Sequence, residues 1–168
     1  MGEEALRSTE ILFGRFRSEA GTLPAIREIR KKLEDTQEAG KNFKTAPGGT
    51  YDIDFITGYL LVKHGVREKG GTLRERLGRC QKSGLLVASD AARLDQAAEV
   101  LRTAEHASRL VTGRVAKWLP NTEHAFKVTD DLVARVLGRS FRDGLAGELE
   151  RASSEVRSIY ERVLREVE

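Results

Sequence analysis

Residues 44–61 read KTAPGGTYDIDFITGYLL, and this stretch decides what kind of fold the chain adopts. A proline, two glycines and two aspartates stand directly before a run of large apolar residues. The apolar residues recur at spacings of three and four, which is typical of a helix with a wide buried sector. That sector contains Ile53, Phe55, Ile56, Tyr59, Leu60 and Val62. We therefore expect a buried helix that extends to about Gly65 and is preceded by a polar turn.

Helices are expected on both sides of this stretch, because only three prolines interrupt the chain and each lies near a predicted break. The apolar pattern predicts helices over about 3–20, from Thr22 to Gly40, from Thr72 to Gly84, from Ser89 to about Val111, from Thr129 to Gly138, and from about Leu145 onward. Residues 42–44 lie outside these helices and could form a short strand or an extended arm. The expected fold is all-α, an antiparallel bundle of about six to seven helices.

The last helix carries a heptad pattern, with apolar residues spaced alternately by four and three. These residues are Leu145, Leu149, Ala152, Val156, Ile159 and Val163. Because the other helices offer complementary apolar stripes, we expect this helix to pack inside the bundle and not in a parallel dimer.

The composition agrees with a single helical domain over residues 1–168. A chain of this length can bury a continuous core, and a third of its residues are charged while only 6% are aromatic. Cys80 is the only cysteine, so no internal disulfide can form, and we expect it to be a small buried side chain. His106 is expected to face solvent, and Glu105 to pair with Arg109 one turn later.

Charge and hydropathy argue against several classes of function. The net charge of +3, from 29 basic and 26 acidic residues, is too balanced to predict nucleic-acid binding. Residues 63–82 carry seven basic and two acidic side chains, which form either a solvated face or a surface for an acidic partner or phosphate. Without interleaved aromatics, base stacking is not expected. No segment resembles a membrane span or a secretory signal, so we expect a soluble cytoplasmic protein with neither a nucleic-acid nor a membrane partner.

The turn before the buried helix has two interpretations. The sequence Pro47-Gly48-Gly49 allows unusual backbone angles, and consecutive amide N–H groups can then converge on an anion near the positive end of the helix. Lys44 is close enough in sequence to add a counter-charge for a phosphate. The alternative is a purely structural turn, because Gly-Gly turns before helices are common.

The two aspartates of the motif also have two interpretations. Asp52 and Asp54 are two positions apart, so on a helix they diverge by about 200° and do not face one partner. Each could cap an amide or oppose the helix dipole. Alternatively, one caps the helix while the other reaches across a cleft toward a metal-bound nucleotide.

The order of the motifs resembles a known family. The segments LPAIREIRKKLED, FKTAPGGTYDIDFITGYLLVKHG, TLRERLGRCQKSGLL and EHASRLVTGR occur in succession. Together they resemble the helical domain that follows the nucleotidyltransferase domain in glutamine synthetase adenylyltransferases. The resemblance covers residues 23–168 and leaves 1–22 as a separate N-terminal helix. The segment RLVTGR favours this family over the related PII uridylyltransferases, which share a similar Gly-Gly segment.

The resemblance implies a role in nitrogen regulation. Enzymes of this family transfer AMP from ATP to a tyrosine of glutamine synthetase and remove it by phosphorolysis, using Mg²⁺ held by carboxylates of the nucleotidyltransferase domain. This chain shows no sign of that domain, so no catalytic residue and no metal ligand is assigned to it, and we do not expect it to be active alone. The implied partners are a nucleotidyltransferase domain, in cis or in trans, glutamine synthetase, and the PII signalling protein. ATP and Mg²⁺ are implied only for the complete enzyme.

Residue by residue, Lys44, Gly48, Gly49 and Asp52 match the family pattern, and the resemblance implies that they line the edge of the nucleotide cleft together with Asp54. The family usually has glutamate at position 54, and aspartate draws the carboxylate back by about 1.5 Å. This chain also departs from the family at Thr50, Tyr51, Gly58 and Gly71. The alternatives are a non-catalytic helical interaction module that has lost the nucleotide edge, and the corresponding domain of a PII uridylyltransferase.

Overall fold

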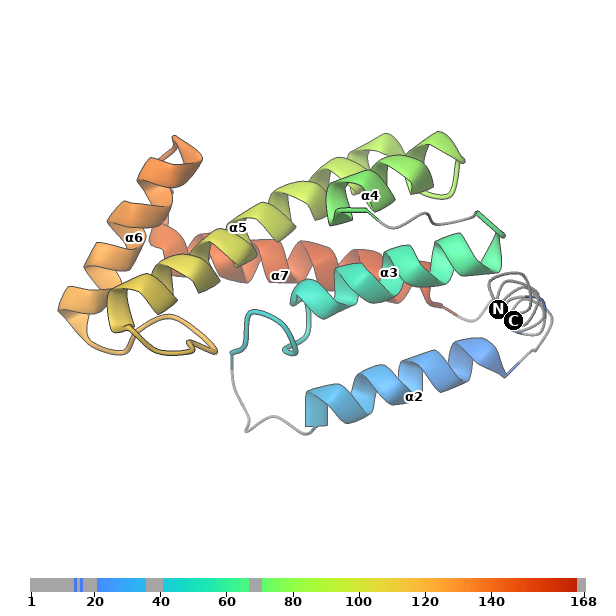
Figure 1. Ribbon diagram of the computed structural model, residues 1–168, viewed down its shortest axis with the longest axis horizontal. Helices are drawn as coiled ribbons and strands as arrows, with labels where there is room; N and C mark the ends of the chain where they lie inside the picture. The colour runs from blue at the N-terminus through green and yellow to red at the C-terminus, as the bar shows by residue number, and fades with distance from the viewer. Residues whose placement is uncertain (1–13, 15, 17–20, 36–40, 67–70, 166–168) are drawn as a thin grey trace, which may run out of the picture.

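The computed structural model describes residues 14, 16, 21–35, 41–66 and 71–165. Within these residues the chain forms six α-helices and no β-strand (Figure 1). The helices are α2 (Thr22–Asp35), α3 (Thr50–Lys63), α4 (Leu73–Lys82), α5 (Ala88–Thr112), α6 (Glu123–Leu137) and α7 (Gly144–Val163). The all-α prediction is confirmed. Apart from the helical Gly14 and Phe16, the helix expected over 3–20 lies outside the described residues.

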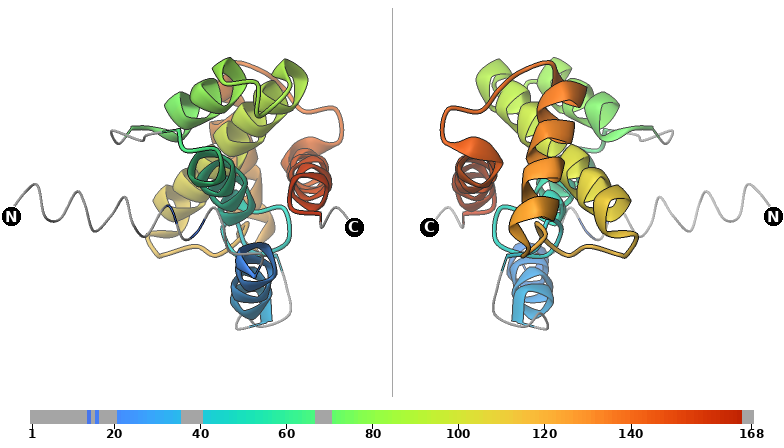
Figure 2. Two further views of the ribbon diagram at one scale, coloured as in Figure 1. Left: turned by 90° about the vertical axis from the view of Figure 1, so that its right-hand side faces the viewer. Right: turned by 90° about the vertical axis from the view of Figure 1, so that its left-hand side faces the viewer.

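The long helix α5 is the centre of the bundle and contacts α3, α4, α6 and α7. Helices α3 and α7 run in the opposite direction to α5, as the antiparallel prediction requires (Figure 1). Helix α2 lies along the outside of the bundle (Figure 2).

Two hydrophobic clusters fill the bundle, one toward each end of α5. The first includes Ile53 and Leu94 and joins α3 and α4 to the first half of α5 and the second half of α7. The second includes Leu101 and Leu149 and joins α6 to the other halves of α5 and α7. Phe43, from the turn before α3, belongs to the second cluster. With 25 residues, about 37 Å of helix, α5 is long enough to serve both clusters.

Several sequence predictions about the core are confirmed. Leu145, Leu149, Ala152, Val156 and Ile159 of the heptad pattern are buried, and Val163 packs against the first cluster. Helix α7 therefore packs within the bundle. The side chain of Cys80 is buried, and His106 is exposed.

Three local predictions are wrong. Asn42 to Lys44 form no strand, because the Asn42 side chain accepts hydrogen bonds from the amides of Lys44 and Thr45 and so folds the chain into a turn. Thr129 does not begin a helix. It lies buried within α6, where its hydroxyl donates to the carbonyl of Ala125 one turn earlier. Helix α5 starts one residue before Ser89, at Ala88, and its N-cap is Val87.

Among the described helices, none combines the length and the apolar character that crossing a membrane requires.

Candidate functional site

The turn before α3 is anchored to the second hydrophobic cluster. The ring of Phe43 is buried and lies 4.8 Å from the ring of Trp118, centroid to centroid. The backbone amide of Phe43 donates to the carbonyl of Lys117 at 2.9 Å. The loop between α5 and α6 therefore holds the turn in place, and the residues that follow the turn start α3 in a defined position.

Both glycines of the motif allow close approach of two backbone segments. Gly48 has φ +77°, and a Cβ added there would lie 1.9 Å from the carbonyl oxygen of Ser153 in α7. A Cβ on Gly49 would lie 2.5 Å from the carbonyl oxygen of Lys44. The turn thus packs directly on the backbone of α7, which only glycine permits at position 48.

The backbone amides of residues 48–52 all donate hydrogen bonds within the chain. The amide of Gly48 donates to Asp52 Oδ2 at 2.7 Å. The other four amides donate to backbone carbonyls: Gly49 to Ala46 (2.8 Å), Thr50 to Phe43 (3.0 Å), Tyr51 to Lys44 (3.1 Å) and Asp52 to Gly49 (3.0 Å). A phosphate seat built from these amides therefore requires some of these bonds to break. The predicted phosphate seat stays a prediction, and its most accessible contributor is the Lys44 side chain.

The carboxylate of Asp52 points into the protein. Asp52 and Arg30 have relative exposures of 0% and 1%, and Arg30 Nε donates to Asp52 Oδ1 at 2.5 Å. The other carboxylate oxygen accepts from the Gly48 amide at 2.7 Å and from Arg157 Nη1 at 3.5 Å. Asp52 lies in the first turn of α3, where a negative charge also complements the helix dipole. Its partners all belong to this chain.

Arg30 and Arg157 extend this interaction into a network that joins α2, the turn, α3 and α7. Arg30 Nη2 donates to the carbonyl of Ala46 at 3.0 Å, and Arg30 Nη1 lies 3.3 Å from Glu34 Oε1. Arg157 Nη1 donates to the same Glu34 oxygen at 2.6 Å. We call Arg30, Glu34, Asp52 and Arg157 the α2 joint, because they connect α2 to the bundle through charge.

Burial and the charges of the α2 joint shift the pKa of one of its members, Arg157, and of the neighbouring Tyr160. Burial opposes the charge of Arg157, but the hydrogen bond to Glu161 and the charges of Asp52 and Glu34 outweigh it and raise the pKa of Arg157. Burial raises the pKa of Tyr160, and the negative charge of Asp52 adds to this effect. The Arg157 guanidinium lies over the Tyr160 ring, 4.9 Å from its centroid.

Lys44 and Asp54 remain partly exposed around the start of α3. Lys44 Nζ lies 2.9 Å from Glu105 Oε1, and the Lys44 side chain is 48% exposed. The expected pairing of Glu105 with Arg109 is wrong, because Glu105 is buried against this turn and pairs with Lys44. Asp54 is 40% exposed and pairs with Arg76 of α4. Asp52 and Asp54 therefore have different partners, as their spacing predicts.

Acidic side chains of this chain already pair with part of the basic run at 63–82. Arg74 donates to both carboxylate oxygens of Asp95 on α5, at 3.1 and 3.0 Å, and Arg76 pairs with Asp54. The hydrogen bond and charge of Asp95 raise the pKa of Arg74. Lys63 donates to the hydroxyl of Tyr59 at 2.9 Å. These pairs favour the interpretation of the run as a solvated face.

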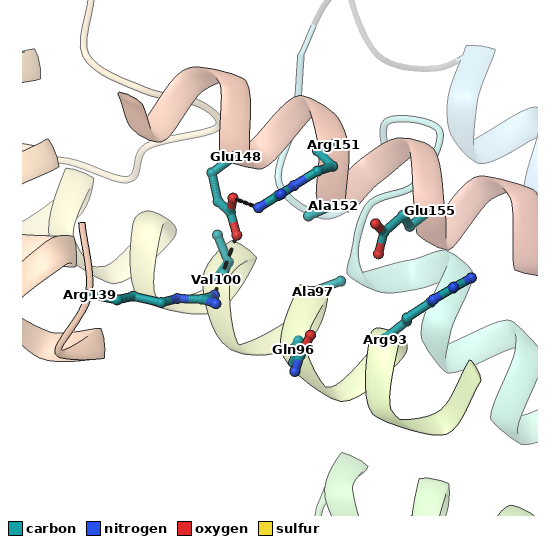
Figure 3. A pocket seen from close by; sticks show the side chains of 9 residues that line it. All are labelled: Arg93, Gln96, Ala97, Val100, Arg139, Glu148, Arg151, Ala152 and Glu155. Carbon is teal, nitrogen blue, oxygen red and sulfur yellow. Dashed lines mark hydrogen bonds and ion pairs between the residues drawn. The ribbon is translucent and has the colours of Figure 1, made fainter. Parts of the chain in front are cut away.

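A second polar site lies between α5 and α7, where sequence reasoning did not predict one. Figure 3 shows Glu148 between Arg139 and Arg151, and Arg139 Nη2 lies 3.4 Å from a Glu148 oxygen. The cavity encloses about 290 Å³ and is also lined by Arg93 and Glu155. Its residues lie far apart in sequence, so no local motif could have revealed it. Three arginines and two glutamates line it, so its charges nearly balance and do not select one class of ligand.

The part of the chain that the structure describes holds no group of three or more His, Cys, Asp or Glu side chains placed to bind a metal ion.

Comparison with known proteins gives consistent matches. The family model described as GlnD PII-uridylyltransferase matches residues 25–164. The bifunctional glutamine synthetase adenylyltransferase/adenylyl-removing enzyme of Streptomyces coelicolor is 26% identical over 175 aligned residues, 97% of this chain and 17% of that protein. The protein of the same name from Streptomyces avermitilis is 26% identical over 146 aligned residues, 83% of this chain and 14% of that protein. The chain therefore spans 14–17% of the length of these curated relatives.

Proposed function

The chain belongs to the GlnD PII-uridylyltransferase family, and from this premise we propose that it is the helical domain of a protein adenylyltransferase that modifies glutamine synthetase. In this role it lines one side of a nucleotide cleft whose catalytic residues belong to a separate nucleotidyltransferase domain. The names of the two Streptomyces relatives support adenylyl transfer as the reaction and glutamine synthetase as the protein substrate.

One observation carries this proposal: the matching motif combines a rigid interior with a charged, partly exposed exterior. Gly48, Gly49 and Asp52 fix the start of α3 against α2 and α7. Lys44 and Asp54 lie at the same turn with about half of their side-chain surface open to a neighbouring domain. A fixed edge with exposed charge is suited to positioning a ligand that another domain binds, because its geometry needs no reorganisation.

Lys44 is the residue most able to contact a nucleotide in this arrangement. Among the described residues its ammonium group pairs with one carboxylate, that of Glu105, and the Lys44 side chain is half exposed. A triphosphate carries more negative charge than one carboxylate and so can compete for this ammonium group. In the complete enzyme, Mg²⁺ would be bound by the nucleotidyltransferase domain and would neutralise charge on the transferred group.

The test is calorimetric titration of ATP·Mg²⁺ into the chain mixed with a nucleotidyltransferase domain in trans. We expect a binding component that requires the added domain and weakens roughly tenfold in Lys44→Ala, the cost of about one charge-assisted hydrogen bond. Lys41→Ala is the matched control, because Lys41 is also an exposed lysine of this turn and pairs with Glu150. Equal effects of the two variants would contradict the proposed role of Lys44.

A second candidate function is a helical interaction module that has kept the bundle and lost the nucleotide edge. Two observations favour it. The backbone amides of residues 48–52 already donate hydrogen bonds within the chain, and the side chain of Asp54 is shorter than the glutamate usual in the family and is paired with Arg76. Absence of any domain-dependent ATP binding would support this module. Domain-dependent binding of UTP in preference to ATP would instead assign the chain to the uridylyltransferase branch.

A further inference from the structure

A groove lies between α2 and α7, and Arg30, Glu34 and Arg157 of the α2 joint are among the residues that line it. It encloses about 660 Å³, a volume within the usual range of small-molecule sites. Figures 1 and 2 show that α2 lies outside the bundle, so the two walls of the groove come from separate layers of the fold. We propose that this groove binds a phosphate anion, either free or as a phosphate ester. The proposal is independent of the nucleotide cleft, because α2 and α7 supply the residues and Lys44 is not among them.

The inner wall of the groove contains a buried donor without an acceptor. Arg30 lines the groove and is 1% exposed, and its Nη1 makes no hydrogen bond. The nearest carboxylate, Glu34, is 3.3 Å from this nitrogen but is already hydrogen-bonded to Arg157. A buried guanidinium nitrogen in this state is costly, and an oxygen atom entering the groove would supply the missing acceptor.

The outer part of the groove has an excess of unpaired positive charge. Arg27, Lys31 and Arg165 line it and have no ion-pair or hydrogen-bond partner among the described residues. Most of the acidic groups nearby are already paired, since Glu28 is bound by Lys32, and Glu34 and Glu161 are bound by Arg157. Among the described residues that line the groove, Asp35 carries the one unpaired carboxylate. Three free cations against one free anion favour a negatively charged ligand.

The side chains of these cations suit phosphate, which carries more negative charge than a carboxylate. Two of the three unpaired groups are guanidinium groups, which donate two parallel hydrogen bonds to phosphate oxygens. A phosphate between Arg27 of α2 and Arg165 at the end of α7 would bridge the two walls. Nucleic acid is a poor alternative because the aromatic side chain that lines the groove, Tyr160, is buried and offers no face for base stacking.

A phosphate bound between Arg27 and Arg165 would have a measurable effect on α2. This helix contributes a single buried residue, Arg30, and it is attached to the bundle by the α2 joint and by the partly buried Leu23 and Ile26. A ligand that contacts both α2 and α7 would therefore slow the opening of α2. Hydrogen exchange of the amides of residues 22–35 reports this directly.

The experiment titrates sodium pyrophosphate and AMP separately into the 168-residue chain by calorimetry, with hydrogen exchange of α2 as a second readout. We expect saturable binding, slower exchange in α2, and affinity reduced at least roughly tenfold in the double variant Arg27→Gln/Lys31→Gln. Both residues are exposed, so the variant is expected to fold. The matched control is Lys82→Gln on α4, since Lys82 is exposed, does not line the groove and pairs with none of the carboxylates that line it.

Each outcome decides the question. Binding of pyrophosphate alone assigns the site to free polyphosphate, and comparable binding of AMP assigns it to a phosphate ester; both support the proposal. The proposal is overturned if neither ligand binds, if the double variant binds as tightly as the unmodified chain, or if Lys82→Gln weakens binding equally. Binding of an oligoglutamate peptide in place of both phosphates also overturns it and assigns the groove to an acidic protein partner.

Discussion

Replacing Asp52 by asparagine removes the negative charge at the centre of the α2 joint while keeping the size of the side chain. In the folded chain this carboxylate accepts from Arg30 at 2.5 Å and from the Gly48 amide at 2.7 Å. Asparagine retains one acceptor oxygen, but its NH₂ group then faces one of these donors. Arg30, which is fully buried, loses its closest counter-charge.

The expected loss of stability follows from the burial of this pair. Neutralising one partner of a buried ion pair costs about 3–5 kcal/mol, because the other charge stays buried without compensation. Glu34 remains 3.3 Å from Arg30 and 2.6 Å from Arg157, so part of the compensation persists. We therefore expect Asp52→Asn to lower the free energy of unfolding by about 3 kcal/mol. For a chain of this length the melting temperature should fall by about 6–12 °C.

Urea unfolding followed by far-ultraviolet circular dichroism at neutral pH measures this loss. Asp54→Asn is the matched control, since Asp54 is half exposed and its loss should cost less than about 1 kcal/mol. A double-mutant cycle with Arg30→Met should give a coupling energy above about 1 kcal/mol. The reasoning is refuted if Asp52→Asn lies within about 1 kcal/mol of the unmodified chain, or if the two asparagine variants unfold alike.

Two further predictions concern single side chains of the same region. Gly48→Ala should destabilise the fold by more than about 3 kcal/mol, because a methyl group at this position meets the backbone of α7. Gly84→Ala is the control: Gly84 has a similar positive φ but lies in open space, so the substitution should cost only about 1–2 kcal/mol. The urea midpoints of the two variants measure this difference. Burial raises the pKa of Tyr160 above its ordinary value of about 10, so the unfolded chain releases this proton at lower pH than the folded chain does. The stabilising contribution is therefore complete below about pH 10 and is lost as pH rises through the folded pKa. Tyr160→Phe should show a shallower fall of the urea midpoint between about pH 9 and 11, and an unchanged slope would contradict this.

Elements that depend on local pattern could be predicted from the sequence. The periodicity of apolar residues identified α3 and the heptad face of α7, because burial of one helix face imposes that spacing. Thr72 was identified as a helix cap, and it forms a capping box with Glu75. Thr129 misled the prediction because a threonine hydroxyl can also bond to the preceding turn of its own helix.

The candidate site could be predicted only in part. The motif residues Lys44, Gly48, Gly49, Asp52 and Asp54 lie in the turn before α3 and in the first residues of α3, and their role at a nucleotide cleft stays a prediction. The partners of these residues could not be predicted. Arg30 lies 22 positions from Asp52, and Arg157 lies 105 positions from it. In the sequence both arginines resemble solvated residues of charged helix faces.

The sequence by itself determined that the chain is helical, where its longest apolar stripes lie, and which turn carries the distinctive motif, since these properties follow from the spacing of residues along one segment. Only the tertiary structure decided what the motif does in the folded chain. In the folded chain the Asp52 carboxylate points inward and binds Arg30, and the half-exposed Lys44 pairs with Glu105. A groove lies between α2 and α7. The physical reason is that the free energy of a charged group depends on the burial and the partners that distant segments provide.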